Sequence, residues 1–208
     1  MKSQDIVILL KLASLYRNEQ RSLQGSVIQP PAFDWEGWEP EESDESEIII
    51  EAYADQYTAR GLEASLGVSK SEVNASINRS LEVGMAVRDR QSDLPRANIK
   101  ALLEFIVHGL KYVFPARPSA MIRGIPTALA APVLEGKVMS AGEYIHVWPD
   151  ARGKSIGQAL PPLFKSVPQA VKKDPDLYAY LALVDAIRMG SPREAGLAAK
   201  MLAERLEA

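Results

Sequence analysis

The sequence predicts a mainly α-helical protein of the α+β class, and three observations lead to this prediction. Apolar side chains recur every three to four residues in several long stretches, as expected for helices with a buried face. Residues 57–90 combine two shorter helical patterns with a glycine turn and a short strand. Residues 143–160 place β-favouring residues on both sides of a turn, which predicts one small hairpin. The long helical stretches are 3–23, 98–113, 174–190 and 191–208.

Residues 57–90 have the spacing of a helix-turn-helix. Thr58 is a predicted N-cap for the first helix, in which two leucines share one buried stripe. Gly67 is expected to end that helix, because glycine tolerates the left-handed conformation that a short turn between helices requires. The sequence from Ser69 to Glu72 matches a capping box, so we expect these two side chains to cap the second helix reciprocally.

The second helix of this motif has an inward and an outward face. Val73, Ile77 and Leu81 repeat every four residues and are predicted to face the core. Asparagine pairs bidentately with an adenine edge, arginine pairs with guanine or a phosphate, and a helix N-terminus favours phosphate through its free amides. The outward face is therefore suited to a DNA groove. The side chains predicted on or near it are Lys70, Ser71, Asn74, Ala75, Asn78 and Arg79.

This segment resembles the winged helix-turn-helix of MarR-like bacterial regulators, whose motif commonly reads L-A-x-x-L-G-V-S-x-S-x-V followed by G-L-V. The matching residues are Leu66-Gly67-Val68-Ser69, Ser71, Val73 and Gly84. Two positions depart from the pattern: Glu63 replaces a small residue, and Ser80 replaces a leucine found in many members. After Gly84, a short strand is predicted to lead into a basic wing that carries Arg88 and Arg90.

The resemblance implies a transcriptional regulator that binds double-stranded DNA in a sequence-specific manner as a homodimer. The second helix of each subunit would then enter successive major grooves, and the wing would contact the flanking backbone. We expect a winged helix-turn-helix domain over residues 1–93 and a mainly helical domain over residues 94–208 that contains the hairpin. The predicted DNA-binding residues are Thr58, Ser69, Lys70, Ser71, Asn74, Ala75, Asn78, Arg79, Arg88 and Arg90.

The C-terminal half carries a second resemblance, to poorly characterised bacterial proteins encoded beside nucleotidyltransferase-type toxins. The shared segments are H-G-x-x-Y-x-F-P at 108–115, R-G-I-P-T at 123–127 and V-W-P-D at 147–150. It implies an alternative function, that of an antitoxin or adaptor that sequesters a partner protein such as a toxin.

The two C-terminal helices are well delimited in the sequence: Asp174 and Ser191 are predicted N-caps, and each precedes a proline at the first helical position.

Two N-terminal stretches each leave more than one interpretation open. Residues 3–23 are apolar on most sides, so this helix is buried either between two layers of its own subunit or against a partner subunit. Residues 24–47 form an acidic insertion whose prolines and like charges favour a loop. Its aromatic residues Phe33, Trp35 and Trp38 either pack locally on the domain or anchor a partner. A third interpretation is that the acidic stretch mimics DNA and covers a basic surface.

Composition excludes several function classes. The chain contains no cysteine, which rules out disulfides and thiolate metal sites and fits a cytoplasmic protein. The net charge of −3 includes ten acidic residues and no base between Asp34 and Asp55, so the remainder is basic by seven charges. No apolar run is long enough for a membrane span, and no catalytic, cofactor or metal motif is present. We therefore expect a protein without enzymatic activity, cofactor, metal or membrane partner.

Overall fold

The computed structural model describes residues 1–23, 37–39, 53–137 and 144–207, and within them the protein is mainly helical with small sheets, as predicted. Most of the predicted acidic insertion, including Phe33 and Trp35, lies outside the described residues. Trp38 is described and buried, with its ring edge-on to Tyr178 at 6.2 Å between centroids. Local packing of this aromatic on the body of the protein is therefore confirmed for Trp38.

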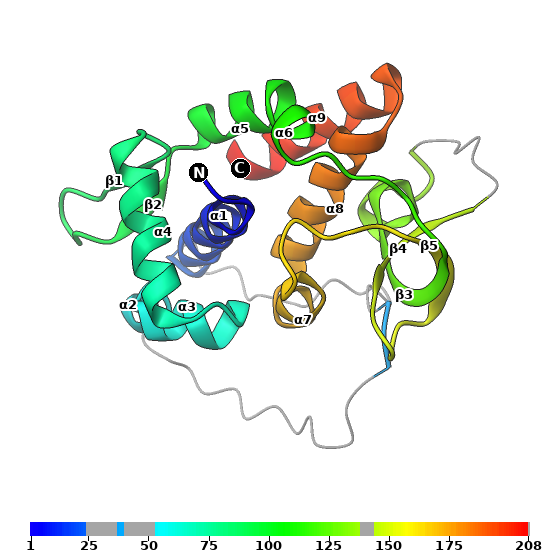
Figure 1. Cartoon of the computed structure of the whole chain (residues 1–208). Helices are drawn as coiled ribbons and strands as arrows, with labels where there is room; N and C mark the ends of the chain where they lie inside the picture. The colour runs from blue at the N-terminus through cyan, green and yellow to red at the C-terminus, as the bar shows by residue number, and fades with distance from the viewer. Residues whose placement is uncertain (24–36, 40–52, 138–143, 208) are drawn as a thin grey trace.

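Helix α1 (Ser3–Leu23) lies at the centre of the molecule (Figure 1). Its side chains are buried from Gln4 to Leu15, because it packs against helix α4 and strand β2 on one side and against helix α8 on the other. Of the two interpretations of this helix, burial within its own subunit is correct. In the described part of the chain, no helix is both long and apolar enough to cross a membrane.

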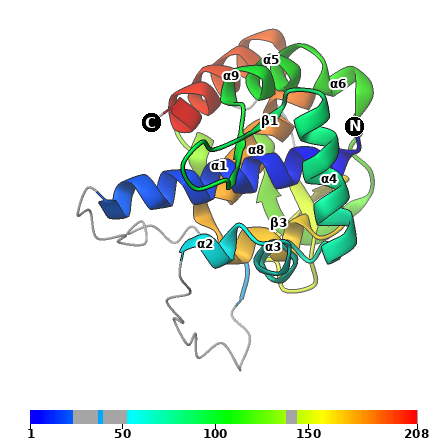
Figure 2. The same ribbon diagram turned by 90° about the vertical axis from the view of Figure 1, so that its left-hand side faces the viewer.

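Beside α1 lie two helices at an angle and a short hairpin (Figure 2). A helical turn, α2 (Tyr53–Gln56), leads to α3 (Ala59–Leu66), and α4 (Lys70–Glu82) follows after a short turn. The turn has the predicted cause: Gly67 adopts φ 65°, and Val68 fills the angle between the helices with 2% of its surface exposed. Two antiparallel strands follow rather than one. They are β1 (Ala86–Arg88) and β2 (Pro95–Ala97).

The remaining helices cover the other side of α1. The predicted helix over 98–113 is divided at Gly109 into α5 (Ile99–His108) and α6 (Leu110–Val113), and the Asn98 side chain caps α5 by accepting from the Ala101 amide. The chain ends in two longer helices, α8 (Pro175–Met189) and α9 (Pro192–Glu207), each with its predicted proline in the first turn. Shorter elements are α7 (Val167–Ala170) and the 3-10 helices η1 (Ala128–Ala130), η2 (Pro132–Leu134) and η3 (Val171–Lys173).

Three strands form a small closed sheet at the far side of α8 from α4: β3 (Met121–Thr127), β4 (His146–Pro149) and β5 (Ser155–Ala159). The predicted hairpin between β4 and β5 is wrong, since each strand pairs antiparallel with β3 and the two are parallel to one another. Their connection crosses β3 where two glycines meet. A Cβ on Gly153 would lie 2.1 Å from the carbonyl carbon of Gly124, so only glycine permits this crossing.

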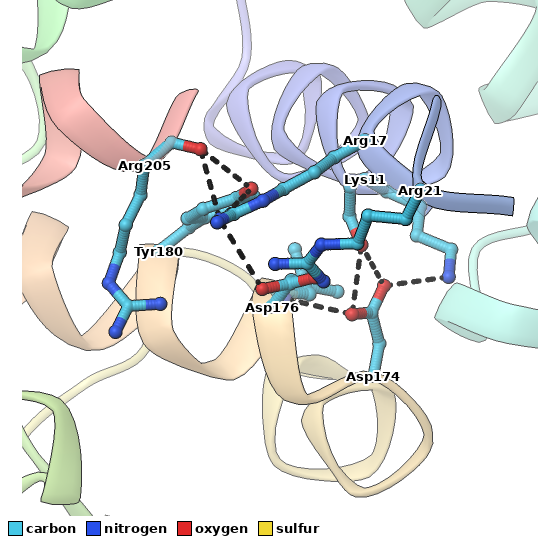
Figure 3. A network of polar contacts seen from close by, with 9 residues as sticks. Lys11, Arg17, Arg21, Asp174, Asp176, Tyr180 and Arg205 are labelled. Carbon is cyan, nitrogen blue, oxygen red and sulfur yellow. Dashed lines mark hydrogen bonds and ion pairs between the residues drawn. The ribbon is translucent and has the colours of Figure 1, made fainter. Parts of the chain in front are cut away.

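A buried polar network joins α1 to the start of α8 (Figure 3). The Asp174 carboxylate caps α8 by accepting from the Leu177 amide at 2.9 Å, and it also accepts from the Lys11 ammonium at 2.8 Å and from the Ser14 hydroxyl. Further along α1, Arg17 and Arg21 both pair with Asp176. Each buried charge has a partner, so the network fixes the position of α1 along α8.

Residues 108–115, 123–127 and 147–150 meet at Asp185 and Arg188 of α8. Thr127 of β3 and Trp148 of β4 both donate to its Oδ2, at 3.0 and 2.7 Å, and Arg188 pairs with its Oδ1 at 2.6 Å. Arg188 also donates to the carbonyl of Phe114, at the end of the first segment. The four side chains satisfy one another in the interior, which indicates a structural role for these segments.

One continuous hydrophobic core includes side chains from α1, α3, α4, α5, α8, α9 and the closed sheet. It therefore crosses the predicted boundary between residues 93 and 94. The division into two domains at that point stays a prediction about the chain's organisation, while the packing that positions α4 is shared by both halves.

Candidate nucleic-acid interface on helix α4

A groove of about 360 Å³ lies between helix α4, the start of α3 and the hairpin. Polar side chains in its lining come from α4 and β1, and apolar ones come from α3, α4 and β2. This combination offers hydrogen-bond donors and acceptors above an apolar floor. The lining residues are Tyr57, Ala59, Asn74, Ile77, Asn78, Arg88 and Pro95.

The floor of this groove is held by Tyr57, whose side chain is 3% exposed. Its hydroxyl donates to Glu19 of α1 at 3.1 Å and accepts from Arg96 of β2, and Arg96 pairs with Glu19 at 2.7 Å. The Arg96 guanidinium also lies 4.7 Å from the ring centroids of Tyr57 and Tyr16. Burial raises the pKa of the Tyr57 phenol well above its usual value, so the hydroxyl stays protonated.

Most of the predicted DNA-binding side chains lie on the surface. Asn74 and Asn78 stand one turn apart on α4, both are exposed, and both line the groove with Arg88. Ala75 is half-buried beside them, and Thr58 uses its hydroxyl oxygen to cap α3 by accepting from the Gly61 amide at 3.0 Å. The other exposed members of the predicted set are Ser69, Lys70, Ser71 and Arg90.

Arg79 does not lie on the outward face as predicted. Its guanidinium turns toward α1 and binds the fully buried Asp5 carboxylate through two hydrogen bonds, Nη2 to Oδ1 at 2.6 Å and Nε to Oδ2 at 3.1 Å. Burial alone would raise the pKa of Asp5, but hydrogen bonds from Arg79 and from the Lys2 amide, together with the charge of Arg79, lower it below its usual value. An arginine held in this way is not available to a base.

The predicted capping box at the start of α4 is wrong as well. Ser69 makes no side-chain cap, and the Glu72 carboxylate binds the Lys2 ammonium at 3.1 Å and the Gln4 amide of α1. In its place, the Glu63 carboxylate of α3 accepts from the Lys70 amide at 3.2 Å. Glu63 is one of the two departures from the MarR-like pattern, and here it occupies the helix N-terminus with a negative charge.

The local charge is modest. Arg88 donates to the Asp93 carbonyl at 2.9 Å and pairs with its carboxylate at 3.3 Å, which holds the two ends of the hairpin loop together. Arg60, Lys70 and Arg90 are exposed and form no ion pair within the part of the chain that the structure describes. These three are the cations near α4 that remain available to a phosphate backbone.

Four groove residues lay outside the predicted DNA-binding set: Tyr57, Ala59, Ile77 and Pro95. Ile77 was predicted to face the core, and the other three come from the ends of neighbouring elements, so helical periodicity gave no signal for them. For Tyr57 there was a usable signal in the sequence: it is an aromatic residue directly before the N-cap Thr58, and an aromatic there packs against the elements that follow. Among the described residues, no group of His, Asp and Glu side chains is placed to hold a metal ion.

Comparisons with protein-family models, with curated proteins and with solved structures found no match to the chain. The geometry of α4 and its groove therefore carries the functional argument by itself.

Proposed function

We propose that the protein is a sequence-specific DNA-binding transcriptional regulator of the winged helix-turn-helix type, with α4 as the helix that enters the major groove. The observation that carries the proposal is the arrangement of α3, a glycine turn, α4 and an antiparallel hairpin, with Asn74 and Asn78 exposed on α4. A major groove admits one α-helix, and side chains on its outward face meet the base edges.

The hairpin supplies the wing of this proposal. Arg90 lies in its loop, exposed and without an ion pair to any described residue, which suits a phosphate contact beside the major groove. Two copies would place two α4 helices in successive grooves. The apolar surface of α1 is already buried within its own chain, so the proposed homodimer has to form through another surface.

The direct test is binding of the purified chain to the DNA upstream of its own gene, measured by fluorescence anisotropy across a salt series with a scrambled duplex as competitor. Specific binding that weakens steeply with salt supports the proposal. Arg90→Ala should weaken binding to both duplexes alike and flatten the salt slope by about one unit, because it removes one phosphate contact. Arg193→Ala on α9, also an exposed arginine without an ion pair to a described residue, is the matched control. Binding indifferent to sequence would overturn the proposal.

A second candidate function is protein binding, of the antitoxin or adaptor type. One observation favours it: Met121, Ile122 and Ile156 are exposed on the closed sheet, with 61% of Ile156 accessible, on the side of the molecule away from α4. The test is co-purification with the product of the neighbouring gene. Ile156→Asp should abolish capture while leaving DNA binding unchanged, and capture that survives this substitution argues against the candidate.

A further inference from the structure

The side chains that line the groove beside α4 are chemically suited to one class of base pair. This inference rests on the proposed function. We propose that α4 reads A·T base pairs, with Asn74 and Asn78 bound to adenine edges and the apolar lining around Ile77 in contact with thymine methyl groups.

Asn74 and Asn78 are the two asparagines that line the groove. Neither side chain forms a hydrogen bond with another residue in the described part of the chain, so both carboxamides are free to bind. A carboxamide presents one acceptor and one donor side by side, which matches the donor N6 and acceptor N7 of adenine. Guanine presents two acceptors at the same edge, so one of them would face the carboxamide oxygen.

The spacing of the amides agrees with neighbouring base pairs. Asn74 and Asn78 are separated by one helical turn, a rise of about 6 Å along α4. Successive base pairs are about 3.4 Å apart along a strand. The two carboxamides can therefore address adenines one or two steps apart in the same major groove.

The apolar lining is suited to contact thymine, the base that pairs with adenine. Ile77 lies between the two asparagines on α4 and is 8% exposed, and Ala59 and Pro95 continue the apolar surface from α3 and β2. Thymine carries the one methyl group of the major groove, next to the edge that pairs with adenine. A polar rim above an apolar floor thus matches both halves of an A·T pair.

The arginines of the segment argue against guanine in the same place. Arginine bound to guanine O6 and N7 is the commonest base contact, but Arg79 is held by the buried Asp5, and Arg88 forms an exposed ion pair with Asp93. Of the polar side chains that line the groove, only the two carboxamides form no hydrogen bond or ion pair with another described residue. Lys70 lies one turn before Asn74, where it is placed to meet the edge of the site.

The experiment is a selection of duplexes from a random pool by the whole chain, followed by atom replacement in the selected sequence. We expect duplexes enriched in adjacent A·T pairs. Replacing their adenines by 7-deazaadenine, which lacks the N7 acceptor, should weaken binding about tenfold per contacted base. Replacing thymine by uracil, which lacks the methyl group, should weaken it several-fold. The same replacements outside the selected pairs should have no effect.

The protein variants complete the test. Asn74→Ala and Asn78→Ala should lose the sensitivity to 7-deazaadenine at one position each, while Asn18→Ala on α1, the same chemical change elsewhere, should keep it. Selected duplexes with G·C pairs at the core, or indifference to the replaced atoms, would overturn the inference and leave the proposed function in place. A pool from which no duplex is enriched would overturn both.

Discussion

The Arg79 guanidinium donates two hydrogen bonds to the buried carboxylate of Asp5 and thereby links α4 to the first turn of α1. The pair lies 74 positions apart in sequence, and Asp5 is fully buried. This contact fixes the position of α4 relative to α1.

Arg79→Met should destabilise the protein by about 3 kcal/mol, because it leaves the Asp5 carboxylate buried without a counter-charge. The free energy of unfolding in urea measures this. Asp5→Asn in the same chain should recover part of the loss, since the unpaired charge is then gone. Equal stability of the single and double variants would contradict the coupling.

The stability that Asp5 contributes should depend on pH. Its folded pKa lies below the unfolded value of about 3.9, so the contribution is fully present above that value and is lost as pH falls through the folded pKa. Arg79→Met removes the hydrogen bonding that is the largest cause lowering the pKa of Asp5, and it leaves burial, which opposes ionisation. The difference in unfolding free energy between wild type and Arg79→Met should therefore shrink between about pH 5 and pH 3. A constant difference across this range would refute the assignment.

Glu63→Gln should raise the affinity for DNA several-fold at low salt. The Glu63 carboxylate lies at the N-terminus of α4, where it repels a phosphate, and glutamine keeps an oxygen that accepts from the Lys70 amide. Anisotropy titration at two salt concentrations measures the change, and Glu104→Gln on the exposed face of α5 is the control. If Glu63→Gln leaves the affinity for DNA unchanged, no DNA phosphate binds at the N-terminus of α4.

Asp174→Asn should destabilise the protein by about 3 kcal/mol or more even though asparagine still caps α8. The reason is the Lys11 ammonium, which is buried with Asp174 as its ion-pair partner. Lys11→Met combined with Asp174→Asn removes the stranded charge and should be more stable than Asp174→Asn alone. Urea unfolding of the three variants decides this, and a double variant that is no better than Asp174→Asn would contradict it.

Gly153→Ala should disrupt the closed sheet, because the added Cβ would meet the Gly124 backbone at 2.1 Å. Thermal unfolding should show a lowered midpoint. Gly196→Ala provides the matched control: nothing lies within 4 Å of its Cβ position in α9, and alanine in a helix is worth up to about 1 kcal/mol over glycine. Similar midpoints for both variants would exclude a tight crossing at Gly153.

The sequence-based predictions succeeded where the determining contacts are local. Asn98 and Asp174 cap the helices that begin one residue later, and Gly67 makes the turn after α3, because each acts on amides or dihedral angles within about three residues. The periodic apolar residues of α4 also face the core as expected, with Val73 fully buried.

The predictions failed where a distant residue competes for the same group. Glu72 has the spacing of a capping-box residue, yet Lys2 and Gln4 of α1 take its carboxylate. Arg79 has the spacing of an outward residue, yet Asp5 holds it. The β4 to β5 connection contains turn residues typical of a hairpin, but pairing of both strands with β3 directs the chain elsewhere. None of these long-range contacts can be predicted from the periodicity of the sequence alone.

The central position of α1 has a consequence for synthesis on the ribosome. This helix is synthesised well before α8, which packs against its apolar surface. Until α8 emerges, the nascent protein presents a long unpaired apolar helix of the kind that chaperones bind and that promotes aggregation. Folding of the whole molecule must therefore wait for the C-terminal helices, and truncation before α8 should leave an aggregation-prone chain rather than a free helix-turn-helix unit.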